Sequence, residues 1–206
     1  MKDKQMMKII KGIAAPLPLA NVDTDVIMPK RFLITITREG LADGTLADLR
    51  FDNVGQLRPE FILNKAPWTR ATILIVGDNF GCGSSREHAV WGLRQAGVEA
   101  IIGTGFAGIF FDNARKNGLT LAILHPDQRD QLMAKIGANP GTEVTVNILE
   151  RSIKVGGWEV TFEMDEVTRQ ALLKNRDDTL DTLKLLSEIQ AYEASLPDSS
   201  RVQIIK

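Results

Sequence analysis

Hydrophobic and polar positions follow two different periods in the middle of the chain. Residues 72–76 form an uninterrupted run of apolar and β-branched side chains, which is typical of a buried strand, and glycines follow it closely. Apolar residues next recur every three or four positions, which predicts a helix from near Ser84 to Ala96 with Gly97 as its C-terminal cap. The chain therefore enters this region as a strand and leaves it as a helix.

The same alternation continues towards the C-terminus. Further strands are expected over residues 98–102 and 119–124, separated by a helix that begins near Phe106 and is closed by Gly118. Another helix is expected from Pro126 onwards. Repeated strand–helix–strand units indicate a parallel sheet with right-handed crossovers.

The flanking sequence predicts strands of a different kind. Residues 9–14 are typical of a strand, and residues 143–149, 152–155 and 158–162 alternate in strand fashion around a Gly156-Gly157 hairpin turn. We therefore expect an α/β fold with a largely parallel central sheet and added antiparallel strands.

The rest of the chain is patterned more weakly. Residues 30–65 are punctuated by glycine, so a mobile or lid-like connection is expected there. Residues 177–193 carry leucines on one helical face, which predicts a C-terminal helix that packs on its own domain or meets a partner subunit. We expect a single domain over residues 1–196 and a loosely held tail over 197–206.

Charge and composition exclude several classes of partner. The 25 basic and 26 acidic side chains nearly cancel, so no global field favours nucleic acid or an anionic membrane. No apolar run is long enough to span a bilayer, and the N-terminal residues lack the apolar centre of a secretory signal. The expected location is the cytoplasm.

Cysteine and histidine usage limits metal chemistry within this chain. Cys82 is the single cysteine, so the chain cannot form an internal disulfide or hold a four-cysteine iron–sulfur cluster by itself. His88 and His125 have no ligands nearby at zinc spacing. We expect no metal site and no cofactor belonging to this chain alone, and Cys82 is more typical of packing beside a glycine turn than of a nucleophile.

The most distinctive stretch is the glycine-hinged loop over residues 81–88. Ser84 followed three residues later by Glu87 fits a capping box, and a helix N-terminus exposes N–H groups that bind carboxylate or phosphate. Arg86 in the same turn opposes the helix dipole at a cost of about 0.3–1 kcal/mol. The sequence leaves two interpretations open: a plain helix cap with a solvated arginine, or an anion-binding site.

A second polar turn precedes residues 26–29. Asp23 and Asp25 flank Thr24 in this turn. Their side chains are expected to make local hydrogen bonds of the Asx-turn kind, with a catalytic role as the alternative.

Several blocks in register resemble one known family. Residues 21–33, 79–89, 106–110 and 117–119, with the tail at 191–193, are similar to the small subunits of 3-isopropylmalate dehydratases, in the aconitase superfamily. The Gly-Cys-Gly-Ser-Ser-Arg-Glu block is highly specific. The resemblance implies a three-layer β/β/α swivelling domain, equivalent to the mobile fourth domain of aconitase but made as a separate polypeptide.

The same resemblance implies the reaction and the partner. The family isomerises 2-isopropylmalate to 3-isopropylmalate by loss and re-addition of water in leucine biosynthesis. A large-subunit partner carries the 4Fe-4S cluster on three cysteines of its own, and the substrate is a small hydroxy diacid.

Residue roles are carried over by position in the motifs. Ser84 takes the role of the base, and Ser85 and Arg86 take that of substrate-carboxylate binders. The counterpart of a further substrate arginine of aconitase is Lys30, Arg31 or absent.

The remaining carried-over residues support the site or line it. The expected supports are Asp23, Thr24, Asp25, Gly81, Cys82 and Gly83. The expected apolar lining for the isopropyl group is Phe32, Leu33 and Ile34.

Two alternatives remain beside this function. One is a hydro-lyase for a related acid, such as citramalate or dimethylmalate, because such substrates differ by only a few methylenes. The other is a non-catalytic anion-binding assembly module that uses the helix N-terminus without chemistry.

Overall fold

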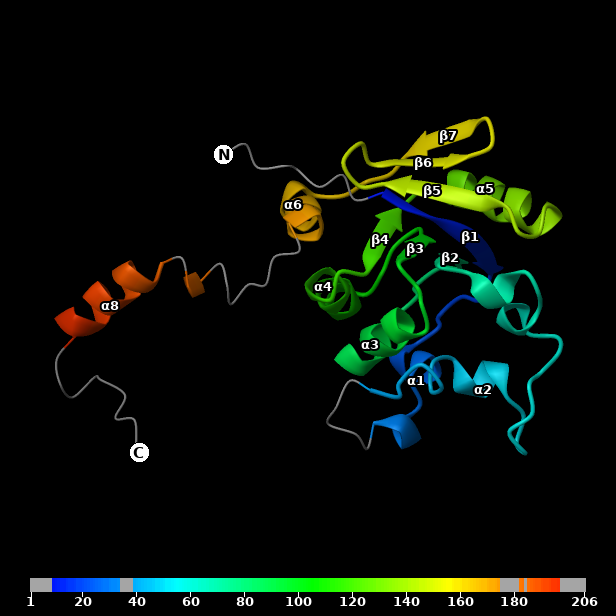
Figure 1. Cartoon of the computed structure of the whole chain (residues 1–206), viewed down its shortest axis with the longest axis horizontal. Coiled ribbons are helices and arrows are strands. Elements are labelled where there is room, and N and C mark those ends of the chain that lie inside the picture. Colours follow the sequence, from blue (N-terminus) through cyan, green and yellow to red (C-terminus); the bar gives the residue numbers. More distant parts are fainter. Residues whose placement is uncertain (1–8, 34–38, 175–181, 184, 197–206) are drawn as a thin grey trace. The chain divides into compact units, whose positions relative to one another are not determined.

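The computed structural model describes residues 9–33, 39–174, 182–183 and 185–196 of the chain (Figure 1). The chain divides into two compact units, Met1–Asn175 and Arg176–Lys206. The first unit contains the sheet and most of the helices. Its elements in chain order are β1 (Ile9–Leu17), α1 (Thr24–Ile27), η1 (Lys30–Phe32), α2 (Ala47–Arg50), η2 (Ile62–Asn64), η3 (Trp68–Arg70), β2 (Ile73–Val76), α3 (Glu87–Gln95), β3 (Ala100–Gly103), α4 (Gly108–Lys116), β4 (Thr120–Ile123), α5 (Pro126–Ala138), β5 (Glu143–Asn147), β6 (Ser152–Val155), β7 (Trp158–Thr161) and α6 (Glu166–Lys174).

A single sheet of seven strands in the order β4-β3-β2-β1-β5-β6-β7 organises the first unit. Strands β1 to β4 are parallel, whereas β5, β6 and β7 are joined to them in antiparallel fashion. The predicted α/β class is confirmed, with its parallel centre and antiparallel addition.

Strand β1 belongs to both halves of this sheet. Its first part, Ile9 to Ile13, pairs with β5, and its last part, Ala14 to Leu17, pairs with β2. The strand is longer than the expected 9–14 because its C-terminal residues find a parallel partner that the local sequence does not reveal. The two kinds of pairing are thus joined by one continuous backbone.

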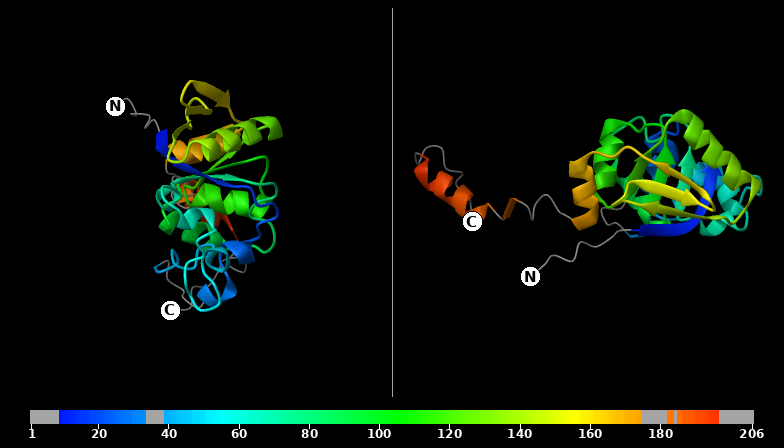
Figure 2. Two further views of the ribbon diagram at one scale, coloured as in Figure 1. Left: turned by 90° about the vertical axis from the view of Figure 1, so that its right-hand side faces the viewer. Right: turned by 90° about the horizontal axis from the view of Figure 1, so that it is seen from above.

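The parallel strands are buried on both faces. In β2, Ile73 and Ile75 lie in one hydrophobic core with α5 and the antiparallel strands, while Leu74 and Val76 lie in a second core with α3 and α4. Figures 1 and 2 show α5 and β5 to β7 on one side of the parallel strands and α3 and α4 on the other. Burial on both faces explains why these strands are continuous apolar runs and do not alternate.

Helix α6 was not anticipated from the sequence. The backbone N–H of Thr168 donates to Asp165 Oδ1 over 2.8 Å, which caps the start of the helix, and Leu172 and Leu173 are buried in the core. This hydrogen bond is the largest cause that lowers the pKa of the Asp165 carboxyl. An aspartate just before an apolar helical stretch is the signal that would have identified α6.

Part of the expected lid-like segment packs firmly. Leu41, Leu46 and Ala47 are each only 1% exposed, and Leu41 and Leu46 belong to the core that includes α3. These residues anchor the middle of residues 30–65, while residues 34–38 lie outside the described part of the chain. Mobility of the whole segment stays a prediction.

The second unit contains helix α8 (Leu186–Ser195), none of whose residues is buried. The predicted helix over 177–193 falls partly outside the described residues, and α8 begins later and ends two residues further on. The single domain expected over residues 1–196 stays a prediction.

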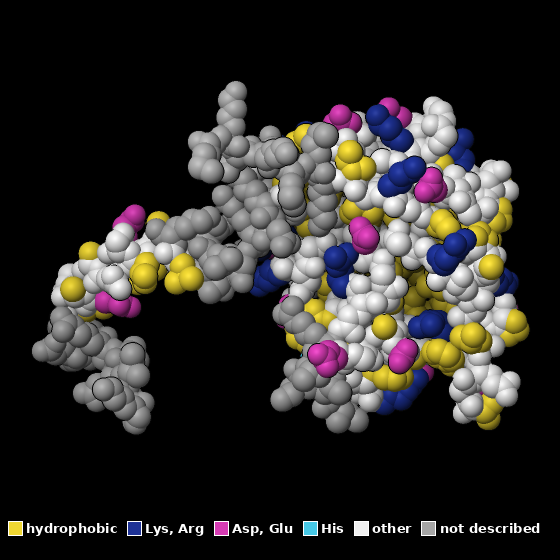
Figure 3. Space-filling view, viewed as in Figure 1, with side chains coloured by type: hydrophobic (Ala, Val, Ile, Leu, Met, Phe, Trp, Pro, Cys, Tyr) yellow, Lys and Arg dark blue, Asp and Glu magenta, His cyan; other side chains and the backbone are white. Residues whose placement is uncertain are grey.

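Charged side chains of both signs are interspersed on the face of the first unit that Figure 3 shows. Neither sign gathers into a broad patch on this face. This distribution accords with the near-zero net charge of the sequence.

Gly12 offers a test of the junction in β1. A Cβ built on Gly12 would lie 2.0 Å from Thr72 Oγ1, so Gly12→Ala should lower the free energy of unfolding by about 1–3 kcal/mol through overpacking. The matched change Gly137→Ala, in α5 with open space around it, should raise stability by about 0.5–1 kcal/mol. Urea unfolding followed by circular dichroism measures both, and equal effects at the two positions would contradict the assigned packing.

Candidate functional site

Three loops meet where the parallel strands β1, β2 and β3 end. The loop after β1 pairs with the loop after β2: Asp23 forms a parallel bridge to Cys82, and the backbone N–H of Gly81 donates to the Val22 carbonyl over 2.7 Å. Phe80 forms a parallel bridge to residue 106 in the loop after β3. Carboxyl ends of neighbouring parallel strands are the usual place for a ligand site in such sheets.

Two glycines allow the loop after β2 to lie close to its neighbours. Gly81 has a φ of +80°, and a Cβ there would lie 2.3 Å from Cγ of Phe110 on α4. Gly83 has a φ of +88° and faces the Asp23 side chain. Both positions need a residue without a side chain.

The loop leaves the hydroxyl-bearing residues in solvent. Ser84 and Ser85 are exposed, while the backbone carbonyl of Ser84 accepts a hydrogen bond of 2.9 Å from Thr24 Oγ1. Thr24 itself is only 2% exposed. A buried hydroxyl thus holds the backbone of Ser84, and the Ser84 side chain is left accessible.

The predicted capping box is wrong. Helix α3 begins at Glu87, with Arg86 as an extended N-cap residue that makes no side-chain cap bond. The Glu87 carboxylate instead accepts a hydrogen bond of 2.7 Å from Asn117 Nδ2. Asn117 Oδ1 in turn accepts a hydrogen bond of 2.9 Å from Trp91 Nε1. Glu87 therefore bonds to a residue that is distant in the sequence, and not to the N-cap backbone that the local pattern predicted.

Arg86 is compensated by a residue from the neighbouring loop. Its guanidinium forms an ion pair with Asp25, and the Arg86 side chain is 15% exposed against 43% for Asp25. The interpretation of Arg86 as a merely solvated cation is therefore wrong. Asp23, by contrast, accepts at Oδ1 a hydrogen bond of 2.7 Å from the Val26 N–H, which confirms the expected local turn.

The weaker candidates after the first signature lie in different surroundings. Arg31 donates to Asp48 Oδ1 over 2.6 Å and lies 4.8 Å from the Phe32 ring centroid, and the hydrogen bond to Asp48 raises the pKa of Arg31. Lys30 is exposed. Phe32 and Leu33 pack against the core that includes α3, and Ile34 lies outside the described residues.

A buried arginine supports the loops from the opposite side. Arg129 on α5 is 8% exposed, donates to the Val76 carbonyl over 2.9 Å and lies 3.1 Å from Asp78 Oδ1. Asp78 also accepts from Thr104 over 2.7 Å, and this bond, followed by the Arg129 charge, lowers the pKa of the Asp78 carboxyl. No local pattern indicates this network, because an arginine on an amphipathic helix normally faces solvent.

These contacts determine what the site can do. The loop carries two exposed serines directly before Arg86 in the sequence, and the planar fork of a guanidinium suits a carboxylate. Among the described residues, no group of three or more histidine, cysteine, aspartate or glutamate side chains could hold a metal ion. The described helices are also too short or too polar to cross a membrane.

Residues 4–126 match the family model of the aconitase C-terminal domain. This match covers more than half of the chain, including all the loops described above. The parallel strands and the three loops of the site therefore lie within the region that matches this family.

The similar proteins extend over nearly the whole chain. The 3-isopropylmalate dehydratase small subunit 1 of Mannheimia succiniciproducens is 46% identical over 91% of this chain and 93% of its own length. The small subunit of Jannaschia sp. is also 46% identical, over 90% of this chain and 92% of its own.

A solved structure is similar as well. The crystal structure of 3-isopropylmalate dehydratase (leuD) from Methanocaldococcus jannaschii matches with a TM-score of 0.65 and 28% identity, over 89% of this chain and 99% of the other. The chain belongs to the aconitase C-terminal domain family and, within it, to the 3-isopropylmalate dehydratase small subunits.

Proposed function

We propose that this chain is the small subunit of a hydro-lyase that interconverts 2-isopropylmalate and 3-isopropylmalate in leucine biosynthesis. Relatives named 3-isopropylmalate dehydratase small subunit match about nine-tenths of the chain at 46% identity. The observation that supports a chemical role for this chain is the loop that carries exposed Ser84 and Ser85 directly before Arg86, whose guanidinium is paired with Asp25. The related citramalate and dimethylmalate activities remain outcomes of the substrate test below.

Ser84 is the proposed base. It would remove the proton from the carbon next to a substrate carboxylate, which requires the hydroxyl to act as an alkoxide. The positive charge of Arg86 and the N-terminal end of α3 both lie within three residues of Ser84 and favour a negative oxygen there. Thr24 contributes by holding the Ser84 carbonyl, which restricts the backbone that carries the reactive hydroxyl.

Ser85 and Arg86 are the proposed carboxylate binders. A guanidinium can donate two parallel hydrogen bonds to one carboxylate, and the Ser85 hydroxyl can add a third. Asp25 holds Arg86 through their ion pair, so the guanidinium is placed before a substrate arrives. Lys30 and Arg31 stay alternative proposals for a second carboxylate contact, and Phe32, Leu33 and Ile34 stay proposals for the isopropyl lining.

The proposed partner is a large subunit that carries a 4Fe-4S cluster. This chain's residues do not fit such a group, because Cys82 is its single cysteine and the described residues form no three-ligand cluster. When bound on the partner, the cluster would act as a Lewis acid on the leaving hydroxyl. The small subunit would then bind the carboxylate, hold the proton at Ser84 Oγ and cover the substrate, in a complex expected to work in the cytoplasm.

Replacing Ser84 tests the proposed base. In the reconstituted complex, Ser84→Ala should lower kcat roughly 100- to 10,000-fold with little change in KM, because only the proton transfer is lost. The exposed Ser84 side chain should leave folding and assembly intact. Ser152→Ala, a buried serine of β6, is the matched control and should keep its turnover. Near-normal turnover of Ser84→Ala in an assembled complex would instead favour the anion-binding assembly module.

Thr24 tests whether the Ser84 backbone must be held. Thr24→Val removes the donor to the Ser84 carbonyl and should lower the free energy of unfolding by about 1 kcal/mol. It should also lower kcat, while Thr24→Ser, which keeps the hydroxyl, should restore most of the turnover. If Thr24→Val lost stability but kept its full kcat, Thr24 would be a structural residue only.

The division of labour between two subunits can be tested directly. The purified chain should contain no iron and show no hydro-lyase activity until a cluster-bearing large subunit is added. Assays of the pair on 2-isopropylmalate, citramalate and dimethylmalate, followed by absorbance of the alkene, should favour 2-isopropylmalate by about 10- to 200-fold per missing methylene. Activity of the isolated chain would overturn the proposal.

A further inference from the structure

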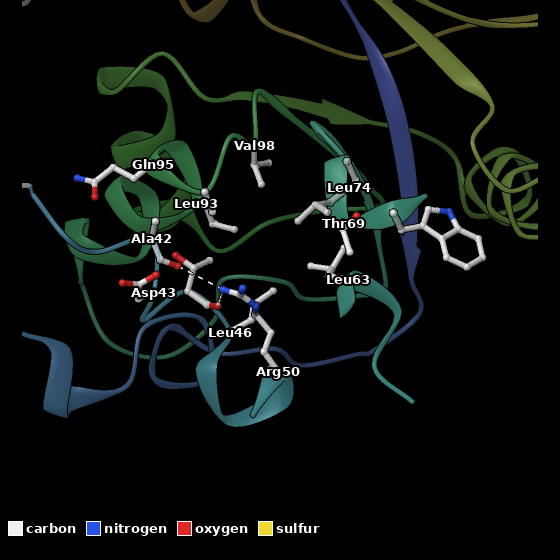
Figure 4. A pocket seen from close by; sticks show the side chains of 14 residues that line it. Ala42, Asp43, Leu46, Arg50, Leu63, Thr69, Leu74, Leu93, Gln95 and Val98 are labelled. Atoms are coloured by element: carbon white, nitrogen blue, oxygen red, sulfur yellow. Dashed lines mark hydrogen bonds between the residues drawn. The ribbon is translucent and has the colours of Figure 1, made fainter. Parts of the chain in front are cut away.

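A cavity of about 320 Å³ lies at the other end of α3 from the Ser84 loop. Its walls come from the segment around α2, from the η2–η3 region, from β2 and from the last turn of α3 (Figure 4). Its lining includes Arg50, Leu63, Thr69, Leu74, Leu93 and Gln95. Its volume lies at the lower end of the range for small-molecule sites.

One side of the cavity is an apolar wall. Leu74 of β2 and Leu93 of α3 are core residues, and Leu63 packs against the same core. Figure 4 shows these three side chains bordering a common space. An aliphatic group placed there would be removed from water on several sides, which favours binding.

Arg50 supplies a charge at the same cavity. Its NH1 donates to the carbonyls of Ala42 and Thr45, both at 3.4 Å, which is long for a hydrogen bond of this kind. No residue in the described part of the chain forms an ion pair with Arg50. Asp43 also lines the cavity, and its side chain is exposed to solvent. The guanidinium therefore keeps donors available for an anion in a partly buried place.

The cavity does not belong to the proposed active site. Gln95 and Ala96 line it at the C-terminal end of α3, whereas Arg86 precedes the N-terminal end of that helix. Nine helical residues separate these ends by about 14 Å. None of the residues assigned to substrate or base chemistry lines the cavity.

We propose that this cavity binds a small branched aliphatic carboxylate. The carboxylate would accept hydrogen bonds from the Arg50 guanidinium, and the branched chain would contact Leu63, Leu74 and Leu93. A guanidinium beside apolar side chains selects a ligand with one anionic end and one apolar end, because each part then finds its matching surface. A phosphate or a sugar would leave the leucine wall uncovered, and a purely apolar molecule would leave the charge of Arg50 without a counter-ion.

Titration of the full chain with 4-methylpentanoate, followed by the amide signals in NMR, tests the proposal. The signals of Thr69, Gln95 and Ala96 should shift with saturation below about 10 mM, the upper limit expected for a small ligand that is matched at both ends. The alcohol 4-methylpentan-1-ol, with the same skeleton but no charge, should bind roughly 10- to 100-fold more weakly. Succinate, with charges but no branched chain, should not shift these signals.

Three variants assign the contacts. Arg50→Gln should weaken 4-methylpentanoate roughly 10- to 100-fold. Ala71→Leu keeps Arg50 but places a larger side chain in the cavity, and it should abolish binding of 4-methylpentanoate. Arg70→Gln makes the same charge change at an exposed arginine outside the cavity and should bind like the unchanged chain. Thermal melts followed by circular dichroism check that each variant is folded. If the Arg50→Gln variant does not fold, the loss of binding in Ala71→Leu tests the proposal instead.

Three outcomes would overturn the proposal. The first is absence of saturable binding at about 10 mM. The second is equal binding of the acid and the alcohol. The third is a set of shifts confined to residues 81–86, which would place the ligand at the Ser84 loop. Because the titration uses the chain without any large subunit, these results are independent of the proposed reaction.

Discussion

The double pairing of β1 is the constraint on which the molecule depends. Its first half pairs antiparallel with β5 and its second half pairs parallel with β2, so one strand joins two kinds of sheet. The parallel half then delivers the loop after β1 to the same edge as the loop after β2. This register brings Asp25 to Arg86 and Thr24 to the carbonyl of Ser84.

The site is built from contacts between loops that are remote in sequence. An arginine at a helix N-terminus is locally unfavourable, but its ion pair with Asp25 supplies the missing negative charge. A buried threonine holds the Ser84 backbone while the Ser84 hydroxyl stays in solvent. Glycines at positive φ and tertiary polar contacts thus keep this loop in one arrangement.

Helix α3 connects this loop to the rest of the core. Its N-terminal end carries Arg86, its middle is held to the end of α4 through Asn117, and its C-terminal end borders the cavity beside Arg50. A packed helix transmits displacement poorly unless it has two discrete positions. The cavity and the loop therefore share a scaffold, and the ligands proposed for them could bind independently.

The sequence by itself determined the alternating strands and helices and the antiparallel addition, because period and glycine punctuation are local signals. It also singled out the loop at Ser84 as a candidate anion site, which stays a prediction. It misplaced the start of α3, since Glu87 bonds to Asn117 instead of closing a capping box. Only the tertiary structure decided that Asp25 pairs with Arg86 and that Arg129 is buried beneath Asp78. Those partners lie 50 or more positions apart, and nothing in a local pattern specifies which distant charge will meet which.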